Sequence, residues 1–169
     1  MIEIRREHAE KVVELLGHGL VAGVGNPTPG QMCVEAAVCF ALGLPHGDDP
    51  GCVSPSLRRL KIRLNDASWS SNQARAEGLK RLAVAQLGSL GVLDDAEFRR
   101  RVIGMTIRKT VPVGLRAAAT RNPTRAAAYA ASARTRDRML AEYAEHAVQI
   151  LIDMGAPGCQ WLDLVPMAS

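Results

Sequence analysis

Apolar side chains recur at helical spacing along most of this chain, and that period constrains its fold more than any other feature. The pattern is clearest near the C-terminus, where Leu140, Ala147 and Leu151 fall on one face of a helix. Alternation typical of strands is confined to 20–24 and 111–113. The sequence therefore predicts an all-α fold, a compact single-domain helical bundle of about five to six helices with one long C-terminal helix.

Residues with capping chemistry mark the expected helix ends. Glycines follow several apolar stripes, and Ser, Thr, Asp or Asn precede others, in two cases directly before a proline. Asp94 with Glu97 resembles a capping box. These signals predict helices over 5–16, 28–42, 71–87 and 122–154, with further helix starts at Ser54 and Asp94.

The length of 169 residues suits one domain, so we expect residues 1–169 to form a single helical unit with the tail 155–169 docked on its body. Trp161 and Leu164 are the expected anchors of that tail. The N-terminal segment is charged and amphipathic, unlike a signal peptide, and no apolar run is long enough to span a membrane. The four cysteines are expected to be free thiols of a cytoplasmic protein that needs no cofactor.

Positive charge is concentrated in the middle of the chain. From Arg58 to Arg138 there are eighteen Lys and Arg against six Asp and Glu, and the segments on either side are each net negative. Such asymmetry indicates an anionic partner: nucleic acid, a nucleotide or an acidic protein. The alternative is a solvated surface produced by a GC-rich genome, because arginine greatly outnumbers lysine.

One glutamate interrupts an otherwise apolar helix. Glu35 and Cys39 differ by four positions and share a face, and the loop after Gly43 can bring His46 and Asp48 back beside them. A carboxylate near an imidazole is the raw material of general acid–base chemistry, so Glu35, His46 and Asp48 are candidate catalytic residues. The structural alternative is that Glu35 accepts hydrogen bonds from the loop 46–52 and holds it in shape.

The cysteines do not predict a metal site. Cys33 and Cys39 point to well-separated directions on one regular helix, and the close cysteine pairs typical of structural zinc sites are missing. A thiol beside a carboxylate is also a poor nucleophile, because the negative charge raises its pKa.

The segments MCVEAAV (32–38), GLPHGDDPGCVSP (43–55) and LND (64–66) resemble a group of small uncharacterised helical proteins from actinobacteria and their phages. In that group a cysteine–glutamate helix precedes a loop of the form Asp-x-Pro-x-Cys, which Asp48, Pro50 and Cys52 match here. The resemblance covers about a third of the chain. It implies a phage- or defence-related setting, and it implies no activity.

Three functions are compatible with these features. The first is a small binding protein whose arginines contact an anionic partner, DNA included, because the guanidinium fork makes paired bonds to phosphate or carboxylate. The expected contacts are Arg58, Arg59, Arg63, Arg99, Arg100, Arg101 and Arg108. The second is an enzyme using a Glu35 and His46 acid–base pair in a pocket under the loop 43–53. The third is a homo-oligomer or assembly subunit that associates through the alanine-rich segment 126–133.

Overall fold

The protein is all-α, as the apolar period predicts. The structure is a computed structural model that describes residues 3–110 and 125–167, with the side chains at 109, 110 and 125–131 excepted. Within those ranges the backbone forms helices and loops and no strand, apart from one isolated antiparallel bridge between Gly25 and Met32. No described helix is both long enough and apolar enough to cross a membrane.

The helices follow one another as α1 (Arg6–Leu16), α2 (Val34–Ala41), α3 (Pro55–Asn65), α4 (Asn72–Ala85), α5 (Asp95–Met105), the π-helix η1 (Thr106–Thr110), α7 (Arg125–Asp153) and the 3-10 helix η2 (Pro157–Leu164). Three predicted starts are confirmed by their caps. Ser54 and Ser71 accept the backbone N–H groups of Leu57 and Ala74, and Asp94 accepts two at the start of α5.

The second helix begins later than the sequence predicts. Thr28 and Pro29 do not start it; α2 begins at Val34, and the Cys33 thiol accepts the Ala36 N–H at its N-terminus. The preceding residues turn through Gly30, whose φ of 80° is left-handed, and pair with residue 25 across the bridge. That local pairing satisfies backbone groups that a longer helix would have used.

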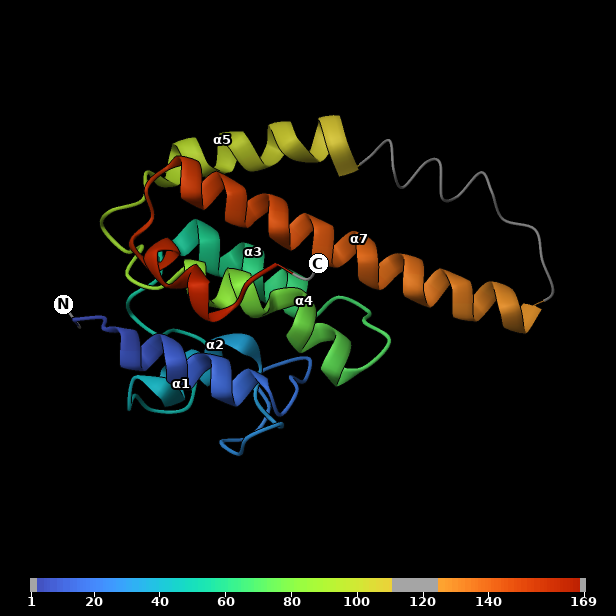
Figure 1. Cartoon of the computed structure of the whole chain (residues 1–169), viewed down its shortest axis with the longest axis horizontal. Helices are drawn as coiled ribbons and strands as arrows, with labels where there is room; N and C mark the ends of the chain where they lie inside the picture. The colour runs from blue at the N-terminus through green and yellow to red at the C-terminus, as the bar shows by residue number, and fades with distance from the viewer. Residues whose placement is uncertain (1–2, 111–124, 168–169) are drawn as a thin grey trace.

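Helix α4 lies at the centre of the molecule (Figure 1). It packs against α7 on one side and α1 and α2 on the other, while α5 packs on α3 and α7. The Trp69 ring fills the space over Gly78 of α4, where a methyl group would overlap it, and Ala141 of α7 lies beside the same point. Small residues thus allow α4 and α7 to approach each other closely.

The C-terminal tail docks on this core through η2. Trp161 is buried, and Leu164 is partly buried against the core. Gly158 lies directly against the backbone at the end of α4, where a side chain would meet the carbonyl of Ala85 at 2.8 Å. The tail therefore packs against the C-terminal end of α4 and against α1.

Candidate functional site

Glu35 lies at the centre of a buried polar cluster formed with Lys61 of α3 and Gln86 at the end of α4. All three side chains are fully buried. Glu35 Oε1 is 3.4 Å from Lys61 Nζ, and Glu35 Oε2 accepts a hydrogen bond of 3.2 Å from Gln86 Nε2. The cluster ties three helices together at one point in the core, and it explains how an apolar helix carries a carboxylate.

Burial favours the neutral forms of both charged groups. It raises the pKa of Glu35, against the opposing attraction of Lys61, and it lowers the pKa of Lys61, against the attraction of Glu35. The 3.4 Å contact is an ion-pair distance without hydrogen-bond geometry, and Glu35 Oε1, Lys61 Nζ and Gln86 Oε1 have no hydrogen-bond partner among the described residues. The cluster is therefore held by one hydrogen bond, from Gln86 to Glu35, and by the close approach of Lys61 to Glu35.

Lys61 and Gln86 are partners of Glu35 that were not predicted from the sequence. Lys61 lies in an arginine-rich segment, and lysine is usually exposed, yet here it is fully buried. A signal was present in the sequence, because Leu57, Lys61 and Leu64 are spaced at i, i+4 and i+7 and so share the buried stripe. A lysine opposite a lone buried glutamate completes the charge pair that Glu35 requires.

The structure does not join the three candidate catalytic residues. His46 is exposed, and its Nε2 lies 3.0 Å from the carbonyl oxygen of Gly25, in the loop before α2. Asp48 accepts a 2.7 Å hydrogen bond from Arg58. No hydrogen bond or ion pair links Glu35 to the loop 46–52 in the part of the chain that the structure describes. The loop is held by Arg58 and Gly25, and the expected loop donors to Glu35 are replaced by Lys61 and Gln86.

Glu35 and Asp48 do line a common small cavity, of about 50 Å³. Its other lining residues are Gly23, Val24, Cys33, Val34, Ile62, Asn65 and Asp66. His46 is not among them. Glu35 pairs with Lys61 and does not contact His46, so the structure does not bring the expected acid–base pair together.

The thiols near this cluster are poor nucleophiles. Burial, followed by the charge of Glu35, raises the pKa of Cys39 to about 11, and burial also raises the pKa of Cys33 and Cys52. All four cysteines are free. Among the described residues, no group of three or more His, Cys, Asp or Glu is arranged to hold a metal ion.

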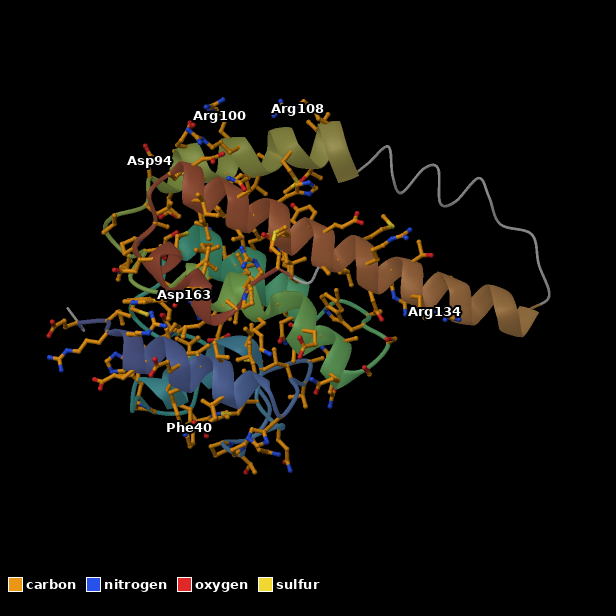
Figure 2. All side chains as sticks on the ribbon, viewed as in Figure 1. Phe40, Asp94, Arg100, Arg108, Arg134 and Asp163 are labelled. Atoms are coloured by element: carbon orange, nitrogen blue, oxygen red, sulfur yellow. The ribbon has the colours of Figure 1, made fainter. Side chains whose placement is uncertain are left out.

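The seven candidate binding arginines fall into different surroundings. Arg58 pairs with Asp48 and Asp49, and Arg100 and Arg101 both pair with Glu97. Figure 2 shows Arg100 of α5 and Arg108 of η1 on the side that faces away from the rest of the molecule. Local carboxylates therefore already neutralise three of the seven charges, which weakens them as contacts for an external anion.

Three of these arginines meet at one groove between α3, α5 and α7. Arg59, Arg63 and Arg99 are exposed and form no hydrogen bond or ion pair with any residue that the structure describes. The groove has a volume of about 420 Å³. It is lined by Ser56, Arg59, Leu60, Arg63, Phe98, Arg99, Val102, Ile103, Thr106, Ile107 and Tyr143.

The floor and far wall of this α3–α5 groove are apolar. Phe98 is buried beneath it, and Ile103 and Ile107 line it while remaining 59% and 64% exposed. The hydroxyl groups of Thr106 and Tyr143, which also line the groove, form a hydrogen bond of 2.8 Å with each other. A concave, mostly apolar surface with a few convergent charges is the usual form of a ligand site.

A half-buried carboxylate sets the position of the groove's two arginine-bearing helices. Asp95, the first residue of α5, accepts hydrogen bonds from the Ser54 hydroxyl at 2.8 Å and the Ser56 backbone N–H at 3.0 Å. Ser54 in turn donates its backbone N–H to the Ser89 hydroxyl. These bonds fix the N-terminal ends of α3 and α5 together, so that Arg59 and Arg99 lie about one turn further along each helix.

Comparisons of the chain with protein-family models, curated proteins and solved structures gave no match. The resemblance to small actinobacterial and phage proteins therefore stays a prediction.

Proposed function

We propose that this protein is a binding protein that takes an anionic ligand in the α3–α5 groove. The observation that carries the proposal is the convergence of Arg59, Arg63 and Arg99 on one groove. None of them forms an ion pair with a residue that the structure describes, and the nearby Asp95, whose pKa Arg99 helps to lower, is already hydrogen-bonded to Ser54 and Ser56. Like charges placed together cost free energy when unpaired, so an anion bound between them relieves that repulsion. Guanidinium groups also suit phosphate and carboxylate geometry.

The groove supports a compact ligand better than a nucleic-acid duplex. Duplex binding needs many cations along an extended face, and Arg58, Arg100 and Arg101 are engaged with Asp48, Asp49 and Glu97. Few aromatic side chains line the groove for stacking on bases, Phe98 being buried. The acid–base enzyme has no comparable support, because no contact joins Glu35 to His46.

The test is a titration of the whole protein with three anions at low salt: dodecyl phosphate below its micelle concentration, ATP and a 12-base-pair DNA duplex. The parent is compared with Arg59→Gln/Arg63→Gln/Arg99→Gln. We expect at least one anion to bind the parent and the triple variant to lose at least tenfold in affinity.

The charge-matched control is Arg100→Gln/Arg101→Gln/Arg138→Gln, whose positions lie outside the groove. It should bind as the parent does, and circular dichroism should show all three proteins equally helical. If no anion binds the parent, or if the control loses as much affinity as the groove variant, the proposal is wrong.

A further inference from the structure

The groove changes in polarity from one end to the other. Ser56, Arg59 and Arg99 lie toward the joined N-terminal ends of α3 and α5, and Ile107 lies toward the opposite end. The two helices run in the same direction in Figure 1, so the sequence order along each is also the order along the groove. Arg59 and Arg99 thus lie toward one end of the groove and Ile107 toward the other, with Arg63 and Ile103 between them.

The aliphatic end carries exposed apolar side chains in the part of the chain that the structure describes. Ile103 and Ile107 are four positions apart on one face and are 59% and 64% exposed, a span of about 6 Å along the helix. Leu60 and Val102, partly buried, continue this surface down into the groove. Adjacent exposed isoleucines beside an apolar hollow indicate a surface that an apolar group covers.

We infer that the groove binds a small amphiphilic anion: a single-chain molecule with a phosphate or carboxylate head and an aliphatic tail. The head lies between Arg59 and Arg99, with Arg63 one turn further along α3, and the tail lies along Val102, Ile103 and Ile107. This inference rests on the proposed function and narrows its ligand class. The volume of about 420 Å³ is within the range of small-ligand pockets.

The charge of the ligand's head group and the length of its alkyl chain lead to two separate predictions. Each buried methylene contributes about 0.8 kcal/mol, or roughly a fourfold gain in affinity per carbon. Dodecyl phosphate should therefore bind at least a hundredfold more tightly than butyl phosphate. Dodecyltrimethylammonium, with the same chain and the opposite charge, should bind at least tenfold more weakly than dodecyl phosphate.

The apolar contacts are tested with Ile103→Ser/Ile107→Ser, and the matched control is Val92→Ser, which removes an equally exposed aliphatic side chain outside the groove. By isothermal titration calorimetry, the double variant should lose at least tenfold in affinity for dodecyl phosphate and less than twofold for butyl phosphate. The control should match the parent for both ligands.

The outcomes separate this inference from the proposed function. If butyl and dodecyl phosphate bind equally and both depend on Arg59, Arg63 and Arg99, the groove is an anion site. The inference of an amphiphilic ligand is then wrong. If dodecyltrimethylammonium binds as well as dodecyl phosphate, the charge assignment is wrong. If binding requires vesicles of phosphatidylglycerol and is absent with monomeric dodecyl phosphate, the source is a membrane surface and the inference of a free ligand is overturned.

Discussion

At the scale of single residues, Lys61 is the position whose replacement should reveal most about the core. Lys61→Met removes the only cation that contacts Glu35 among the described residues, and it leaves a buried carboxylate unpaired. Breaking a buried ion pair from one side costs about 3–5 kcal/mol. We expect urea unfolding to show a loss of that size. Lys11→Met, which breaks a more exposed pair with Glu14, should change stability by less than about 0.5 kcal/mol.

The double variant Glu35→Gln/Lys61→Met should recover most of this loss, because neither charge is then buried alone. A glutamine at position 35 also offers an N–H to Gln86 Oε1, which has no partner among the described residues. Equal stability of Lys61→Met and the parent would show that Glu35 does not depend on Lys61.

The buried pair also predicts a pH dependence of stability. The folded protein holds the Glu35 proton to a higher pH than the unfolded chain, so this group's contribution falls as pH rises above its unfolded pKa. Lys61 has a lowered pKa when folded, so the unfolded chain binds more protons below pH 10.5 and this contribution increases as pH rises toward that value.

The difference in free energy of unfolding between the parent and Glu35→Gln/Lys61→Met isolates these contributions. We expect the free energy of unfolding of the parent, relative to that of the variant, to be lowest near the middle of the pH range. It should increase toward both the acidic and the alkaline end. Urea titrations from pH 4 to pH 10 measure it. A difference that stays constant over the whole range would contradict the shifted pKa values.

At the scale of secondary-structure elements, Asp95 joins α3 to α5. Burial alone raises its pKa, but the hydrogen bonds from Ser54 and Ser56 outweigh burial and lower it overall. Its stabilisation is therefore present above the unfolded pKa of the carboxyl group and is lost as pH falls through the folded value. Asp95→Ala should cost about 1–3 kcal/mol, because it leaves two donors without their acceptor.

The same change should weaken the groove, since Asp95 sets the distance between the helices that carry Arg59 and Arg99. We expect Asp95→Ala to reduce dodecyl phosphate affinity under conditions where the variant is still folded by circular dichroism. Glu142→Ala, an exposed residue of α7 paired with Arg138 at 3.8 Å, is the control. If the affinity of Asp95→Ala for dodecyl phosphate is unchanged, the Asp95 contact does not position the arginines of the groove.

The docking of η2 depends on the absence of a side chain at residue 158. A methyl group there would overlap the backbone at the end of α4, so Gly158→Ala should displace η2 and cost about 1–3 kcal/mol. In a Trp69→Phe background, Trp161 emission should shift to the red as that ring becomes solvated. Gly47→Ala, whose new Cβ meets nothing closer than 4.0 Å, should leave the emission unchanged.

At the scale of the whole molecule, association through residues 126–133 stays a prediction, because side chains 126–131 lie outside the described residues. Small side chains allow close helix approach, whereas Arg134 and Arg136 next to them oppose a symmetric contact. Light scattering at high concentration, with an Ala130→Glu variant as comparison, tests it. A monomer at every concentration would exclude this contact, and dissociation caused by Ala130→Glu would support it.

Local chemistry was enough to predict the class of fold and several helix starts. The 3.6-residue period and the caps at Ser54, Ser71 and Asp94 act within a few residues, so they can be read directly from the chain. The start of α2 was predicted wrongly because Thr28–Pro29 has the local chemistry of a helix start. The bridge between Gly25 and Met32 and the left-handed turn at Gly30 override it.

The sequence by itself determined that Glu35 needs a partner, because an ionisable group on an apolar helix face is costly to bury alone. Only the tertiary structure decided which partner, since Lys61 and Gln86 reach Glu35 from helices that are distant in sequence. The charge count likewise indicated an anionic partner. Which arginines remain available depends on carboxylates such as Glu97 and Asp48, whose contacts with those arginines exist only once the chain is folded.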